Sequence, residues 1–319
     1  MYRAVFKVIE PYFFRGPGEF DPSARGVYSS AYSLLAPNPS TTAGALATVF
    51  GYVDTSMMDW DEAYSAVLKG ARIRGPYLRR GSLYHVENRV DEIFLRLDDV
   101  QNYSYLRRGQ LDEKEKLEEK VREIMYLGFT PGRLTMVGIG LMTRVDMRKI
   151  ADEERGLIYT VDFIDYLSGI DAKIGPTDIA IEFDIISENM RSGKYVVRLG
   201  GEGRTSLLEI LEAKDYICKI PEKTNLLYVL SPILYETGSN FIEQLKNEIE
   251  GGEVKVCGKI GLLGAGYSEV RRRRKPIYQA LLPGSIIVLE KEVKGFKIYE
   301  EGIGIGRQLG FGSVIPIEG

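Results

Sequence analysis

The residues best suited to chemistry in this chain are five glycines near its C-terminus, with Arg307 among them. They are Gly302, Gly304, Gly306, Gly310 and Gly312. Because glycine lacks a Cβ atom, its backbone can approach a ligand closely and can adopt positive φ angles. Consecutive amides in such conformations bind anions, and a guanidinium adds a charge that suits phosphate. The segment, called the terminal loop below, therefore predicts a phosphate-binding site.

Two other interpretations of the terminal loop stay open. It could be a flexible turn before an edge strand, or it could pack between domains and shape the groove beside it. Spacing excludes two familiar nucleotide-binding patterns. A dinucleotide fingerprint needs a third glycine and a following βαβ unit, whereas Leu309 stands at the required position and only seven residues follow Gly312. A Walker loop needs Gly-Lys followed by Ser or Thr, which occurs nowhere in the chain.

Two further glycine segments precede arginines. Gly200, Gly201 and Gly203 lead to Arg204, and residues 261–266 lead to Tyr267 and a run of four arginines. A basic run beside a tyrosine offers phosphate contacts and a stacking face, a combination found in single-stranded RNA binders. A solvated surface run is the equally open alternative. The residues predicted to contact RNA are Gly200, Gly201, Gly203, Arg204, Tyr267, Arg271, Arg272, Arg273, Arg274, Gly302, Gly304, Gly306, Arg307, Gly310 and Gly312.

Candidate catalytic residues are few. His85 is the only histidine and could act as the general base of a metal-independent ribonuclease, although a histidine held by a hydrogen bond near a strand is much more common. The pairs Asp59/Asp61 and Asp98/Asp99 could bind Mg²⁺, but a helix start and a strand end are ordinary places for solvated acids. We predict no catalytic residue, no metal and no cofactor.

Composition bounds the class of protein. The chain has 319 residues, a length typical of two domains. Its net charge of −3 gives no global attraction for nucleic acid. Two cysteines, Cys218 and Cys257, cannot build a disulfide framework. Lys7 interrupts the N-terminal apolar stretch, and no apolar run approaches the roughly 20 residues of a membrane helix. These features predict a reduced, cytoplasmic protein.

The hydrophobic pattern of the first two thirds mixes strands and helices. Strands are expected at 2–9, 157–164, 179–186 and 194–199. A helix is expected at 39–50, where Asn38 can cap it and Pro39 suits its first turn. A short helix should follow Asp59, and another should span 111–127. Residues 15–33 read as irregular, and 71–109 read as short strands and loops. The predicted fold class is therefore α+β.

The pattern restarts near residue 222. A strand at 226–235, a helix near 241–249, strands at 254–260 and 285–291, and a last strand at 313–317 fit a ferredoxin-like order. We therefore predict two ferredoxin-like, or RRM-like, domains. The first spans 1–222 and carries large insertions, and the second spans 223–319 and contains the terminal loop.

Several segments, in the same order along the chain, resemble motifs of the RAMP superfamily of CRISPR proteins, in particular the third subunits of type III-B, or Cmr, effector complexes. The terminal loop is similar to the superfamily's glycine loop. Gly266-Tyr-Ser-Glu269 stands where relatives often show Gly-Trp-Asp. In Glu87-Asn-Arg-Val90, asparagine replaces the family's serine, and Asp91 replaces the following glycine. The other matching segments are Pro39-Ser-Thr-Thr-Ala-Gly-Ala-Leu46, Gly200-Gly-Glu-Gly-Arg204, Lys275-Pro276 and Pro283-Gly-Ser285.

The resemblance implies two ferredoxin-like domains and a non-catalytic, RNA-binding role in antiviral defence. It implies that the chain holds the 5′ tag of the guide RNA and bridges the large polymerase-like subunit to the backbone subunits. Two alternatives remain. A guide-processing endoribonuclease of the same superfamily would use His85, and a protein-only adaptor would make no RNA contact through its glycine loops. The non-catalytic, RNA-binding role predicts that Arg307→Glu weakens guide-RNA capture.

Overall fold

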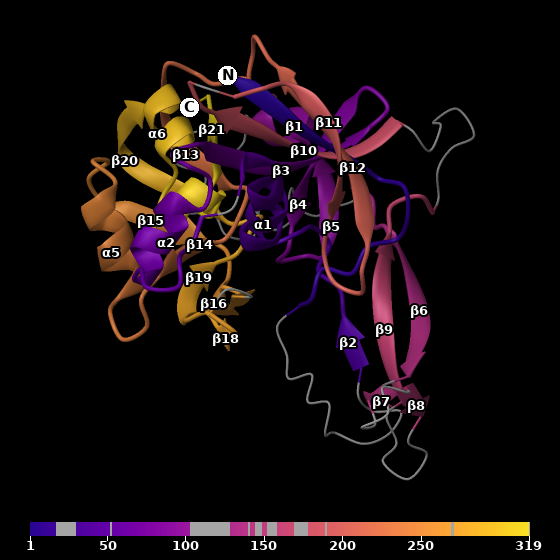
Figure 1. The fold of residues 1–319 in the computed structure, drawn as a ribbon. Coiled ribbons are helices and arrows are strands. Elements are labelled where there is room, and N and C mark those ends of the chain that lie inside the picture. The colour runs from indigo at the N-terminus through magenta and orange to yellow at the C-terminus, as the bar shows by residue number, and fades with distance from the viewer. Residues whose placement is uncertain are drawn as a thin grey trace.

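The computed structural model describes residues 1–16, 30–51, 53–102, 128–139, 141–143, 149–151, 158–168, 178–188, 190–268 and 271–318. Figure 1 shows a body made of two sheet regions and a narrow β-ribbon that extends away from it. The fold is mixed α/β and consists mostly of strands, which agrees with the predicted combination of helices and strands. The helix expected at 111–127 lies outside the described residues.

A seven-stranded antiparallel sheet forms the first part of the body. Within this sheet, β1 (Tyr2–Lys7) pairs with β10 (Ile179–Ile186) and β12 (Thr205–Glu212). The full order is β11-β12-β1-β10-β3-β4-β5. The other four strands are β3 (Arg72–Arg80), β4 (Leu83–Asn88), β5 (Ile93–Arg96) and β11 (Gly193–Arg198). β10 is buried along almost its whole length, as expected for a strand that is covered on both faces.

Two helices follow the predicted positions. α1 (Pro39–Phe50) starts after Asn38 and packs Ala43 and Leu46 into the core of the first sheet. Burial of a leucine side chain such as that of Leu46 contributes about 1.5–3 kcal/mol. α2 (Trp60–Ala66) starts after Asp59, whose carboxylate accepts the amide of Glu62 at 2.8 Å. The capping role expected of the Asn38 side chain is wrong, because that side chain makes no capping hydrogen bond.

The second part of the body is a four-stranded antiparallel sheet of order β15-β20-β13-β21. Its strands are β15 (Val254–Cys257), β20 (Ile286–Lys294), β13 (Lys223–Val229) and β21 (Val314–Ile317). α5 (Phe241–Glu248) connects β13 to β15, and α6 (Gly295–Glu301), which the pattern did not locate, connects β20 to β21.

The single strand expected at 226–235 is wrong, because the chain forms two strands there. β13 ends at Val229, and β14 (Ile233–Tyr235) pairs instead with β19 (Ile277–Leu281) in a separate three-stranded sheet. The third strand of that sheet is β16 (Ile260–Gly264). Pro232 lies between β13 and β14 and has no N–H group to continue a ladder. The break therefore directs one apolar run into two sheets.

The β-ribbon consists of β6 (Gly132–Ile139) and β9 (Ile158–Asp165), and β2 (Ser30–Tyr32) pairs alongside β9. β7 (Leu141–Thr143) and β8 (Lys149–Ala151) pair near its far end (Figure 1). The irregular segment expected at 15–33 is wrong for residues 30–32, which form the parallel strand β2. Three residues carry too little periodicity to identify a strand from sequence.

The two parts of the body share an apolar core. Tyr77 of β3 and Leu97 of α3 (Leu97–Gln101) pack in one cluster with Leu226, Tyr228 and Ile315 of the second part. In the described part of the chain, no helix has both the length and the apolar character that a membrane span requires.

Candidate nucleic-acid interface

The terminal loop has the backbone that its glycines predict. Its five glycines have φ angles of 66°, 80°, 72°, 96° and 61°, in the region that favours glycine. A Cβ atom at position 304 would lie 2.6 Å from the carbonyl oxygen of Leu234, and one at 312 would overlap the carbonyl oxygen of Ile303. The backbone is therefore approached closely, as predicted. The approaching group is the protein's own backbone.

The amides of the terminal loop are mostly bonded within the protein. Ile303 donates to the carbonyl of Gly312 at 3.0 Å, and Gly312 donates to Pro232 at 2.8 Å. The amide of Gly304 donates to both carboxylate oxygens of Glu248 at 2.9 and 3.0 Å. In this conformation these donors are bonded to protein acceptors, so phosphate binding by them stays a prediction. The loop has the alternative form, a segment packed between the two sheets.

The charge of Arg307 is also partly satisfied. Its guanidinium lies 3.2 Å from the Glu248 carboxylate, and 43% of its side chain is exposed. Glu248 therefore fixes the terminal loop at both Gly304 and Arg307.

A buried arginine that the sequence did not single out holds the other side of the terminal loop. Arg74 of β3 is fully buried. Its guanidinium donates to the carbonyls of Tyr299 at 2.7 Å, Glu300 at 2.6 Å and Arg307 at 2.6 Å. Burial lowers the pKa of Arg74 to about 10, which still leaves the cation charged at neutral pH. Arg74 thus binds the carbonyl end of α6 and the terminal loop to the first sheet.

The glycine segment 200–204 forms the turn between β11 and β12. The amide of Gly201 donates to the carbonyl of Phe13 at 2.8 Å, and a Cβ atom at Gly200 would lie 2.5 Å from the same oxygen. Arg204 forms an ion pair with Glu10 at 2.7 Å and lies 4.3 Å from the centre of the Phe163 ring. Gly203 is exposed and has open space around it. This turn is therefore attached to the base of the β-ribbon.

The arginine run forms the turn and second strand of a small hairpin, β17 (Tyr267–Ser268) and β18 (Arg273–Arg274). Arg271 is held inward, because its guanidinium donates to the carbonyls of Thr55 and Asp59 and lies 4.0 Å from the centre of the Trp60 ring. Arg272, Arg273 and Arg274 are exposed. The stacking role expected of Tyr267 concerns a side chain outside the described part of the structure.

Lys275 follows the hairpin. Its ammonium group lies 5.9 Å from the centre of the Tyr64 ring, and burial lowers its pKa to about 8.

Four of the motif segments meet beside the start of α1. Arg89 donates to Glu87 at 2.8 and 3.0 Å and to Oδ1 of Asn38 at 3.4 Å. The amide of Arg89 donates to the carbonyl of Pro283 at 3.0 Å. A Cβ atom at Gly266 would lie 3.3 Å from Oγ of Ser40. Segments that are far apart in the sequence therefore surround the start of α1, next to the arginine hairpin.

The remaining catalytic candidates make contacts that are typical of structural residues. His85 lies in β4 with 7% of its surface exposed, edge-on to the Phe129 ring. Burial lowers its pKa to about 4. Asp59 caps α2, and Asp98 and Asp99 lie in the first turn of α3. Among the described residues, no three His, Cys, Asp or Glu side chains are placed to hold a metal ion.

Comparisons with known proteins bear on these arrangements. No family model matches the chain. The chain is 27% identical over 292 residues to the CRISPR system CMR subunit Cmr3 of Saccharolobus solfataricus, which covers 90% of this chain and 86% of the relative. Two cryo-EM structures of the type III-B Cmr-beta complex contain a chain that is similar in fold. Both complexes are bound to cognate target RNA, and one also holds AMPPnP.

The two structural matches each have a TM-score of 0.63 and cover 90% of this chain and 86% of the other. Their sequence identities are 21% and 22%, so these matches show the fold. The curated relative confirms the resemblance that the sequence motifs indicated.

Proposed function

We propose that this chain, a RAMP protein similar to the third Cmr subunit over nine tenths of its length, is a non-catalytic RNA-binding subunit of a type III-B CRISPR effector complex. In this role it holds the 5′ tag of the guide RNA and bridges the large polymerase-like subunit to the backbone subunits. The observation that carries the RNA-binding part is the exposed arginine hairpin beside the start of α1. Three guanidinium groups there are open to solvent and suit phosphate.

We also infer that each part of the body is a ferredoxin-like unit, divided near residue 222. The second part supports this by the order β13-α5-β15-β20-α6-β21, in which β14 and β16 to β19 are additional strands, and by its sheet order β15-β20-β13-β21. In the first part, β12-β1-β10-β3 have the equivalent sheet order, and the connection from β1 to β3 contains α1. Strand β11 stands where a second helix would connect β10 to β12.

The terminal loop and the 200–204 turn have different roles in this proposal. The terminal loop contributes by fixing the two parts of the body against each other, because most of its amides and the Arg307 charge have protein partners. The 200–204 turn leaves Gly203 exposed, and we keep it as a candidate contact for RNA at the base of the β-ribbon. The phosphate contacts of this proposal therefore come mainly from Arg272, Arg273 and Arg274.

Reversing two hairpin charges tests the RNA-binding part of the proposal. Arg272→Glu combined with Arg274→Glu is expected to weaken guide-RNA binding by roughly 10-fold or more at moderate salt. If each arginine contacts one phosphate, the slope of log affinity against log salt should fall by about 1.4. The measurement is fluorescence anisotropy of labelled guide RNA at several salt concentrations.

The matched control carries the same charge change on the four-stranded sheet, to which the arginine hairpin does not belong. Lys291→Glu combined with Lys294→Glu reverses two exposed lysines at the end of β20. This variant should keep most of the affinity. An equal loss in both variants would show that only net charge matters, and it would remove the hairpin from the proposed site.

The non-catalytic part of the proposal has its own test. The chain incubated with repeat RNA without metal is expected to leave the RNA intact. His85 is buried, its lowered pKa makes it a weak base at neutral pH, and the chain has no second histidine to act as the acid. Denaturing gel electrophoresis of the products measures this. Cleavage that disappears in His85→Ala would establish the endoribonuclease alternative instead.

A further inference from the structure

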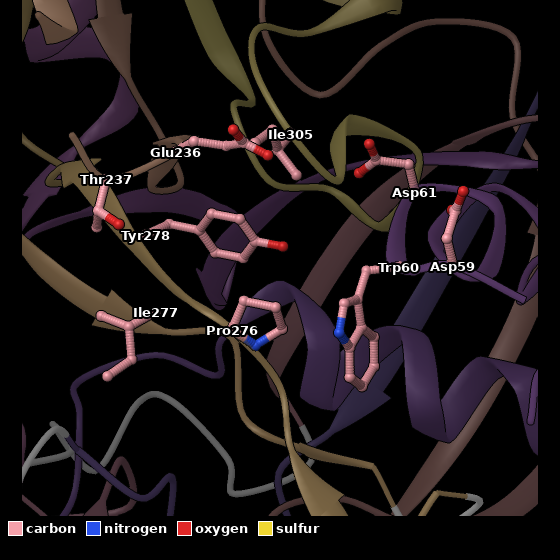
Figure 2. Close-up of a pocket in the computed structure, with 9 residues that line it drawn as sticks. All are labelled: Asp59, Trp60, Asp61, Glu236, Thr237, Pro276, Ile277, Tyr278 and Ile305. Carbon is pink, nitrogen blue, oxygen red and sulfur yellow. The ribbon is translucent and has the colours of Figure 1, made fainter. Parts of the chain in front are cut away.

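A groove of about 410 Å³ opens beside α2, on the side of the body that carries the three-stranded sheet. Figure 2 shows its lining, which comes from four separate segments. These are Asp59–Asp61 at the start of α2, Glu236–Thr237 after β14, Pro276–Tyr278 at the start of β19, and Ile305 of the terminal loop. The rings of Trp60 and Tyr278 both border the opening between these segments (Figure 2).

The polar part of this lining is acidic. Asp59, Asp61 and Glu236 are exposed, and the lining contains no lysine or arginine. Among the described residues, no cation forms an ion pair with these three carboxylates. The Asp59 carboxylate accepts the amide of Glu62 at the start of α2, so Asp61 and Glu236 are the carboxylates that remain for a partner. Burial raises the pKa of the Tyr278 hydroxyl, and the charges of Asp61 and Glu236 raise it further.

The cations nearest to this groove lie against the Trp60 ring. Arg271 and Arg273 have their guanidinium carbons 4.0 and 5.4 Å from the ring centre, and Arg271 is also bonded to backbone carbonyls. The arginine hairpin therefore borders the groove at Trp60 and Asp59, and the acidic side of the groove comprises Asp61 and Glu236. Its negative charge disfavours a phosphate backbone and favours a positively charged side chain.

An apolar surface adjoins the acidic groove. Ile277 lines the groove and is 60% exposed. On the neighbouring strand β16, Leu262 is 68% exposed and Ile260 is 43% exposed. The pairing of Gly264 with Ile277 and of Leu262 with Gln279 places Leu262 and Ile277 on the same sheet face. Contiguous exposed apolar side chains mark protein–protein interaction sites, membrane interaction sites or ligand-binding grooves.

We propose that the acidic groove, together with Ile260, Leu262 and Ile277, is a docking surface for a neighbouring protein subunit. The partner segment inserts a lysine or arginine side chain between Asp61 and Glu236 and packs an apolar residue on Leu262 and Ile277. Charge complementarity argues for this occupant, because the groove offers the Asp61 and Glu236 carboxylates and the Tyr278 ring to a cation. The inference rests on the proposed function only for the source of the partner, another subunit of the complex.

Charge reversal in the reconstituted complex tests this docking surface. Asp61→Lys combined with Glu236→Lys is expected to weaken association with the protein subunits by roughly 10-fold or more, while guide-RNA binding by the isolated chain is retained or strengthened. Leu262→Ser combined with Ile277→Ser should weaken association without changing charge. Analytical size exclusion and native mass spectrometry measure assembly, and anisotropy measures RNA binding at the same salt concentration.

The matched control is Glu188→Lys combined with Glu212→Lys, which makes the same charge change at exposed positions outside the groove. It should assemble as the wild-type chain does. Should the groove variants have a lower melting temperature than the control, Asp61→Asn with Glu236→Gln replaces them and is expected to show the same selective loss.

Three outcomes overturn the docking surface. Assembly unchanged in both groove variants does so directly. Loss of RNA binding with assembly intact would assign the groove to nucleic acid. A wild-type chain that joins no type III-B subunits would overturn the proposed function and this inference together, which separates that failure from one confined to the groove variants.

Discussion

Replacing Arg74 with methionine should lower the free energy of unfolding by roughly 3–5 kcal/mol. The guanidinium is fully buried and donates to carbonyls of α6 and of the terminal loop at 2.6–2.7 Å. Hydrogen bonds from a charged donor contribute more than neutral ones. Methionine fills much of the volume but leaves these buried carbonyl oxygens without a donor. Urea unfolding followed by circular dichroism measures the change.

Arg72→Met is the control, because Arg72 lies two residues earlier in β3 and is only half-buried. Its effect should stay within about 0.5 kcal/mol, as for most surface substitutions. Arg74→Lys should be nearly as damaging as Arg74→Met, since a single ammonium group cannot reproduce the planar fork of donors. If Arg74→Met unfolded within about 1 kcal/mol of the wild-type chain, Arg74 would not be the residue that joins the loop to the first sheet.

The terminal loop shows what glycine spacing can and cannot establish. Alternating glycines correctly indicated positive φ angles and a close approach of another group to the backbone. They could not identify that group. At Gly312 it is the carbonyl of Ile303, and at Gly304 it is the backbone of Leu234 and the Glu248 carboxylate. A ligand loop and a packed loop need the same backbone, so sequence alone leaves both possible.

Local sequence signals were enough to locate some of the helices. Pro39 and the apolar face of residues 43–46 were enough to place α1, and Asp59 was enough to place the start of α2. Pro232 was a visible signal too, because a proline in a supposed central strand argues against continuity. The short strand β2 had no such signal, since its pairing with β9 joins residues that are over a hundred positions apart.

The segments of the candidate RNA-binding site could be predicted from the sequence, but the contacts between them could not. The arginine run and the motif segments could be read directly from the sequence. That Arg89 contacts both Asn38 and the backbone of Pro283 could not be inferred from spacing, because these contacts depend on the packing of two sheets. Nor could spacing reveal that Arg271 is held inward by carbonyls while Arg272, Arg273 and Arg274 remain exposed.

Gly312→Ala and Gly203→Ala should separate the two kinds of glycine in this chain. A methyl group at Gly312 would overlap the carbonyl of Ile303, whose own amide donates to the Gly312 carbonyl. Relief of that overlap must break this hydrogen bond and disturb the loop. We expect Gly312→Ala to lower the free energy of unfolding by roughly 4 kcal/mol or more, the range of severe backbone and packing defects. Thermal and urea unfolding measure it.

Gly203→Ala is the matched control, because Gly203 also has a positive φ of 69° but has open space around it. Only the left-handed backbone conformation is penalised there, at about 1 kcal/mol. Guide-RNA binding should therefore be measurable for Gly203→Ala in a folded chain, and a loss of affinity would assign that turn a direct contact. Suppose instead that Gly312→Ala folded normally and lost only RNA binding. The terminal loop would then be a ligand loop after all, and its internal hydrogen bonds would have to exchange for phosphate contacts when RNA binds.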